Sequence, residues 1–233
     1  MRFTDWLRRA FDGLNLALRC PTNAEGTTNH AQHCSIASWF DRIGARGREC
    51  GSATGRFAGC HRARLTPLDL AKCSHKRGRE VEDYGSWRCA GYDGNFVFVS
   101  AGDQRTYISY GPKPAKTVAS GETLASFNSE GKTIEWRIER RNGKPVPFAT
   151  ILRWNTTVMQ DSGDRVRGQV LVVTRLDPGG VCHVGYVDGR ANPNANDLAV
   201  QLADTRARNF KCGKDKPVIV GEKGPGFSGP YND

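Results

Sequence analysis

The stretch "GQVLVVTRLDPGGVCHVGYVDG", residues 168–189, carries the strongest structural signal in the chain. Two apolar runs flank "DPGG", in which Pro178 and Gly179 suit the second and third positions of a type II turn. The sequence therefore predicts a β-hairpin. Because apolar residues occupy both faces of each arm, we expect this hairpin to be central in a sheet and covered on both sides.

Cys182 and His183 are neighbours in the second arm of this hairpin. Successive residues of a strand point to opposite faces, so Cys182 is expected to share a face with Val184 and Tyr186, and His183 to point to the other layer. A nucleophile and a base on opposite faces cannot act on each other. We therefore predict no catalytic residue at this pair.

The rest of the second half reads as more antiparallel sheet and one helix. "WRCAGYDGNFVFVS", residues 87–100, contains the hairpin signal Asp93-Gly94. "TIEWRIER", residues 133–140, alternates, which predicts a strand with one face in water. Residues 194–213 carry an amphipathic helical pattern. The predicted fold is α+β, an antiparallel curled β-meander of about six or seven strands with one C-terminal helix packed on it.

The composition and the apolar periodicity of the chain change near residue 66. Residues 1–66 contain ten Arg and no Lys, and we find no sustained apolar period there after Leu18. The start also departs from an export signal, because Asp12 interrupts its apolar stretch. We therefore expect 1–66 to be a poorly structured or wrongly assigned N-terminal segment, 67–213 to be the α+β domain, and 214–233 to be a flexible tail.

The eight cysteines suggest staples rather than chemistry. If the helix covers the hairpin, Cys212 at its end lies near Cys182, which predicts a disulfide between them. Cys73 and Cys89 are a possible second pair. The four cysteines of the predicted domain allow three connectivities, so the pairing depends on the inferred arrangement of helix and sheet. The alternative to disulfides is that these cysteines are reduced, buried thiols. Zinc at "CH", residues 60–61, and "CSH", residues 73–75, would need a spacing unlike the usual patterns, so we predict no metal site.

Composition restricts the function without naming it. The net charge of +10 suits an anionic partner: nucleic acid, a lipid surface or an acidic polysaccharide. The sequence has no phosphate-binding glycine loop and no "GxSxG" or "HExxH" motif, so we predict neither a cofactor nor an enzyme. No apolar run approaches the ~20 residues of a membrane helix.

Several segments resemble a group of short exported bacterial proteins of no assigned function. The resemblance covers about residues 84–213 and lies in "WRCAGYDGNFVFVSAGDQRTYISYG", "EWRIERRNGKPVPFATILRW", "GQVLVVTRL", "CHVGYVDGRANPNANDLA" and "FKCG". It implies export but no site residues. "WRCAGYDGNFVFVS" also resembles the opening of the small β-barrel inhibitors of lysozyme found in bacterial envelopes, which are shorter and lack the terminal helix.

These observations predict a periplasmic or secreted, disulfide-stapled binding domain with an envelope or extracellular partner. We expect its binding face on the exposed side of the sheet, near Arg137 and Arg153. A basic nucleic-acid-binding protein is the first alternative, although the charge is spread along the chain without a basic helix or an aromatic RNA-binding signature. An envelope hydrolase or a lysozyme-inhibitor-like protein is the second, and a cytoplasmic location is the alternative to export.

Overall fold

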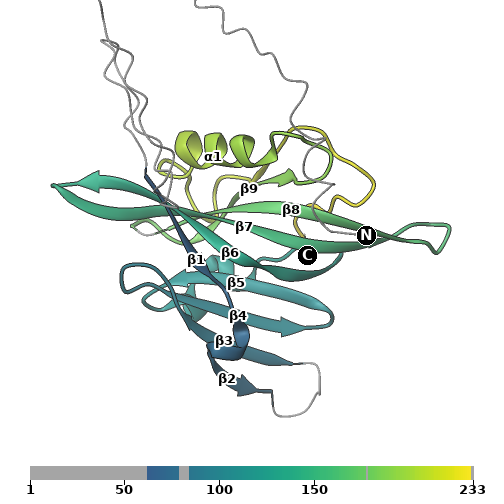
Figure 1. Cartoon of the computed structure of the whole chain (residues 1–233), viewed down its shortest axis with the longest axis horizontal. Coiled ribbons are helices and arrows are strands. Elements are labelled where there is room, and N and C mark those ends of the chain that lie inside the picture. Colours follow the sequence, from purple (N-terminus) through teal and green to yellow (C-terminus); the bar gives the residue numbers. More distant parts are fainter. Residues whose placement is uncertain (1–61, 79–83, 177, 232–233) are drawn as a thin grey trace, which may run out of the picture. The chain divides into compact units, whose positions relative to one another are not determined.

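The computed structural model describes residues 62–78, 84–176 and 178–231, and in them the chain forms ten strands in two sheets and one α-helix (Figure 1). The large sheet has the order β1-β6-β7-β8-β9-β10. Its strands are β1 (Arg62–Pro67), β6 (Phe127–Arg141), β7 (Lys144–Met159), β8 (Arg165–Arg175), β9 (Cys182–Asp188) and β10 (Val218–Val220).

The small sheet has the order β2-β3-β4-β5 and is antiparallel throughout. Its strands are β2 (Ser74–Arg77), β3 (Gly85–Ala90), β4 (Phe96–Gly102) and β5 (Arg105–Gly111). The helix α1 spans Ala195–Arg206, and short 3₁₀ helices are η1 (Leu70–Lys72), η2 (Pro114–Lys116) and η3 (Val118–Gly121).

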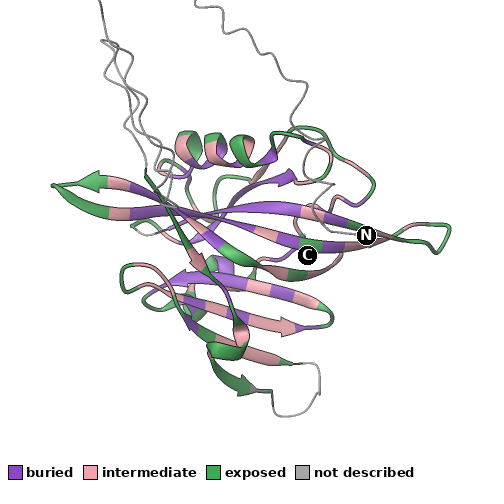
Figure 2. Cartoon of the chain, in the orientation of Figure 1, coloured by how far each residue is buried: buried purple, intermediate pink, exposed green. Residues whose placement is uncertain are grey.

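These elements make three layers, with the large sheet in the middle (Figure 1). One core lies between the two sheets, where Trp136 of β6 meets Tyr110 of β5 edge to face, with ring centroids 5.7 Å apart. A second core lies between the large sheet and α1. β9 is buried along its whole length, as the purple strand in Figure 2 shows, because it is covered on both faces. The central position expected for the 168–189 hairpin agrees with this packing.

The predicted α+β class, with one helix near the C-terminus packed on a mainly antiparallel sheet, is confirmed. The expected number of strands, six or seven, is too low, because the described residues form ten. The strands divide between two sheets because the chain leaves the ladder after β5. Residues 112–126 contain two prolines, which lack the N–H that a ladder needs, and η2 and η3 carry the chain from the small sheet to the large one.

Both expected domain boundaries need correction. β1 begins at Arg62 and pairs antiparallel with β6, so residues 62–66 belong to the fold. The expectation for residues 1–61 lies outside the described residues. The segment expected as a flexible tail is also integrated, since β10 pairs parallel with β9 and Ser228 is buried. Gly185 permits this pairing, because a Cβ there would lie 2.3 Å from the carbonyl oxygen of Val218.

The end of α1 is fixed by a buried cation. The guanidinium of Arg175, on β8, donates hydrogen bonds to the carbonyls of Ala207, Arg208 and Phe210 at 2.8, 2.6 and 2.8 Å. These carbonyls lie at the C-terminal end of the helix, where backbone acceptors lack helical partners and the dipole favours positive charge. Arg175 therefore ties the helix to the sheet by hydrogen bonds rather than by an ion pair.

Candidate functional site

One disulfide joins α1 to the large sheet, and another lies within the small sheet. Cys182 of β9 is bonded to Cys212, which follows α1, with the two Cα atoms 5.7 Å apart. Cys73 is bonded to Cys89 of β3, with the Cα atoms 4.6 Å apart. These are the pairings expected from the sequence, and they give the domain a staple in the helical layer and another in the small sheet.

A β-bulge changes the expected faces of β9. Cys182 packs in the core beneath α1 and His183 points to the other layer, but Tyr186 lies with His183 rather than with Cys182. The register shift leaves Val184 without a partner on β8. One extra residue inverts the alternation that follows it, so the expected shared face of Cys182 and Tyr186 is corrected by the bulge.

His183 is enclosed between the two sheets and is fully buried. Its Nδ1 lies 3.0 Å from the Tyr186 hydroxyl, and its ring packs edge to face on Trp154. Burial lowers the pKa of His183 to about 3, so the ring is neutral at physiological pH. Its backbone N–H donates to Oε2 of Glu122 at 2.7 Å. Nε2 of His183 has no hydrogen-bond partner in the described part of the chain. Because the ring is fully buried, His183 contributes to packing and is not accessible as a base.

Of the two arginines expected at the binding face, Arg137 is buried and only Arg153 lies at a hollow of the surface. Arg137 was expected in water, but α1 covers it, and its guanidinium binds Asp204 of the helix at 2.7 Å and Glu135 at 2.9 Å. Burial disfavours its charged form, but the bonds to Asp204 and Glu135 outweigh that effect and raise the pKa of Arg137. Arg137 therefore connects helix to sheet and is not available to a ligand.

Arg153 does lie at an open surface, in a hollow that we call the helix-side groove. The groove has a volume of about 470 Å³ and lies on the side of the large sheet that carries α1. It is lined by residues of β1, β6, β7, β8 and the first turn of α1: Leu65, Glu130, Gly131, Lys132, Thr133, Glu135, Ile151, Arg153, Asn155, Leu171 and Asn196.

The guanidinium of Arg153 is held by neutral groups. It donates to Oε1 of Gln169 at 3.1 Å and to Oδ1 of Asn196 at 2.8 Å. None of the ion pairs within residues 62–78, 84–176 and 178–231 includes Arg153. Gly189 leaves room for the guanidinium, because a Cβ there would lie 2.3 Å from Nη1. The result is an oriented cation beside an apolar floor made by Ile151 and Leu171.

The sequence does carry a signal for this groove. Along β7, Ile151, Arg153 and Asn155 occupy one face in succession, so that face changes from apolar to polar. Such a change marks the point where the covering layer ends. The N-cap position of α1 is Asn194, which makes no capping side-chain hydrogen bond, and the side chain of Asn196 lines the groove.

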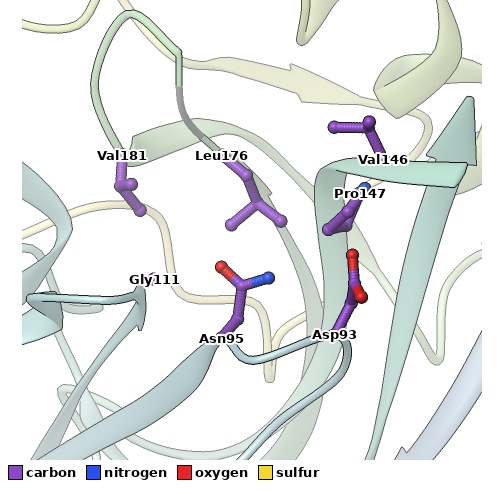
Figure 3. Close-up of a pocket in the computed structure, with 7 residues that line it drawn as sticks. All are labelled: Asp93, Asn95, Gly111, Val146, Pro147, Leu176 and Val181. Carbon is purple, nitrogen blue, oxygen red and sulfur yellow. The ribbon is translucent and has the colours of Figure 1, made fainter. Parts of the chain in front are cut away.

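A second hollow, the hairpin pocket, lies where the β3–β4 turn meets the large sheet and has a volume of about 190 Å³. Figure 3 shows Asp93 and Asn95 pointing toward a wall that includes Leu176, Val181 and Pro147. Its lining offers one carboxylate and one amide, which suit hydrogen bonding to a small donor group. The pocket is too small for an extended ligand.

The residues considered for zinc do not meet in the described part of the chain. Cys73 is bonded to Cys89, and His75 stacks on Trp87 with ring centroids 4.8 Å apart. Cys60 and His61 lie outside the described residues. Within those residues no three His, Cys, Asp or Glu side chains form a group that could hold a metal ion.

Comparison with protein-family models, with curated proteins and with solved structures gives no match. Among the helices of the described residues, none has the length and apolar character needed to span a membrane. The fold and the site therefore define a disulfide-stapled α+β domain with an open groove.

Proposed function

We propose that this protein is an exported, disulfide-stapled binding domain whose helix-side groove takes an extended ligand that presents a carboxylate to Arg153. The observation that carries the proposal is the guanidinium of Arg153, oriented by Gln169 and Asn196 without a carboxylate partner in the described residues. The ligand places its acid at Arg153 and its apolar part on Ile151 and Leu171.

The physical chemistry of the groove supports an acid over a neutral ligand. A planar guanidinium binds a carboxylate through short, charge-assisted hydrogen bonds, and fixing its orientation beforehand reduces the entropy lost on binding. Glu130 and Glu135 also line the groove, but Glu135 is already paired with Arg137. The ligand is therefore selected by where its acid lies as well as by its overall charge.

Export is supported by the two disulfides, since such bonds persist in the periplasm and outside the cell and are rare in the cytosol. The resemblance to exported bacterial proteins agrees with this location. A binding role is supported by the arrangement of the groove, in which the oriented side chain is a hydrogen-bond donor that recognises charge without transferring a proton.

Nucleic acid is the second candidate, because the net charge is +10 and a guanidinium also binds phosphate. The two ligands differ in where they are held. A duplex binds basic residues across the surface, whereas the proposed ligand depends on one groove.

The test compares poly-L-glutamate with a short DNA duplex as ligands of the wild type and of Arg153→Gln. We expect poly-L-glutamate to shift the NMR signals of the Arg153 Nε–H and the Asn196 side-chain amide, and Arg153→Gln to weaken its binding about fivefold. Arg190→Gln removes the same charge from an exposed residue outside the groove and is the control. The groove is rejected as the ligand site if Arg153→Gln and Arg190→Gln lose equal affinity for poly-L-glutamate. It is also rejected if both variants bind DNA more tightly than they bind poly-L-glutamate.

A further inference from the structure

The strand β1 forms one edge of the large sheet and, in the part of the chain that the structure describes, pairs only with β6. Leu68 donates its N–H to the carbonyl of Lys132 at 2.8 Å. Backbone groups of an antiparallel strand point alternately toward and away from the partner, so Ala63 and Leu65 direct their N–H and C=O groups away from β6. Pro67, which has no N–H, takes the third outward position, where none is needed.

The two faces of this edge differ in chemistry. Leu65 faces the helix side, lines the groove and is 66% exposed. Arg62 and Arg64 lie on the opposite face, since Arg64 is directly opposite Trp136 of the inter-sheet core. Both arginines are exposed, and the ion pairs of the described residues include neither of them. The edge is therefore apolar on one face and cationic on the other.

We propose that the β1 edge binds an extended acidic segment of a partner protein as an additional strand of the large sheet. The inference rests on the proposed binding function and names its class of partner. Alternate side chains of an added strand point to opposite faces, so acidic residues lie beside Arg62 and Arg64, while apolar residues lie beside Leu65 at the mouth of the groove. The partner sequence is expected to alternate acidic and apolar residues, with backbone hydrogen bonds supplying affinity.

Charge complementarity selects this occupant over a second copy of the chain. Pairing β1 with the β1 of another copy brings Arg62 and Arg64 close to the same residues of that copy, and like charges across neighbouring strands are destabilising. Exposed charges and a proline are common ways to prevent an edge strand from pairing with itself. An acidic strand turns the same arginines into favourable partners.

The experiment uses the full chain and a short peptide of alternating glutamate and valine with blocked ends. In the free protein we expect fast hydrogen exchange at the Ala63 and Leu65 amides, which slows when the peptide binds, whereas the Arg64 amide exchanges slowly throughout. Ala63→Pro removes an outward N–H without removing a β1–β6 bond and should abolish binding, while its thermal melting stays close to that of the wild type.

A second variant tests charge independently of the backbone. The double change Arg62→Glu and Arg64→Glu should weaken peptide binding about tenfold or more. Arg165→Glu with Arg167→Glu makes the same charge change at exposed positions of β8 and is the matched control, expected to bind within about twofold of the wild type. A peptide of alternating lysine and valine should bind at least about tenfold more weakly.

The outcomes separate this inference from the proposed function. Loss of peptide binding in Ala63→Pro but not in Arg153→Gln supports strand addition and rejects the role of Arg153. The reverse pattern supports the groove and overturns strand addition. Strand addition is also overturned if the Ala63 and Leu65 amides are already protected in the free protein, because another segment or a second copy then covers the edge. Failure of the peptide to bind at all overturns it as well.

Discussion

Removing the disulfide between Cys182 and Cys212 is the most direct test of how the helical layer is held. The bond closes a loop with a sequence separation of 30 residues. The chain-entropy relation gives about 3.7 kcal/mol for a loop of this length, mainly by restricting the unfolded chain. Cys182 is 1% exposed, so a serine there would also bury a hydroxyl, and alanine is the cleaner replacement.

We expect Cys182→Ala to lower the melting temperature by about 7–15 °C, as a loss of that size does in a domain of this length. The doubly substituted protein, with Cys182→Ala and Cys212→Ala, should lose almost no more, because the crosslink can be removed only once. Differential scanning calorimetry and urea unfolding measure both effects, and peptide mapping without reductant first establishes that the native bond is present.

The reference is removal of the bond between Cys73 and Cys89, for which the sequence separation of 16 gives about 3.1 kcal/mol. The reasoning is refuted if the two single alanine variants at Cys182 and Cys212 lose stability additively, since local packing and not the crosslink would then be responsible. It is also refuted if mapping finds both thiols free in protein taken from an oxidising compartment.

Three further perturbations test other parts of the structure. Arg175→Met should cost about 3 kcal/mol in urea unfolding, because it removes the charge-assisted bonds to the end of α1; a loss below about 1 kcal/mol would contradict this role. Asp204→Asn leaves the buried Arg137 with one carboxylate and should cost about 2–3 kcal/mol, a loss that high salt should not reproduce in the wild type. His183 has a folded pKa of about 3 against an ordinary value of 6.5, so its contribution to stability is lost as pH falls from 6.5 toward 3, by up to about 1.4 kcal/mol per pH unit. Burial raises the pKa of Glu122, which changes the stability in the opposite direction as pH falls. Because His183→Phe removes the histidine's contribution, it should flatten the fall in urea midpoint between about pH 6 and 4. An unchanged slope of urea midpoint against pH would refute this.

The sequence was informative where a pattern is local. The alternation in residues 133–140 and the turn residues 177–180 identified strands and a hairpin, and the helical pattern placed Cys212 near Cys182. The same alternation predicts that Arg137 faces water, as a charged side chain on a strand usually does, and this prediction is wrong. Its partner Asp204 is 67 residues away, and a pairing over that distance leaves no local pattern.

Other features were too short or too irregular to show a period. β10 has three residues, fewer than a strand pattern needs, so the sequence predicts a tail there and not a strand. The bulge at Val184 lies in a strand that is buried on both faces, so no change of polarity in the sequence marks the inversion of Tyr186. The groove as a whole could not be predicted because its lining residues come from five elements, and of these residues the sequence predicts only Arg153 at a binding face.

Burial of β9 on both faces has a consequence for how the chain folds. Until both outer layers dock, the hairpin of β8 and β9 exposes apolar surface on two sides, which is a hazard for association with other chains. The small sheet precedes this hairpin in the chain and is available to cover one face as soon as the hairpin emerges. The face beneath α1 must wait for the helix and for Cys212. That face is therefore exposed longest during synthesis, and it is where a chaperone would be expected to bind the incomplete chain.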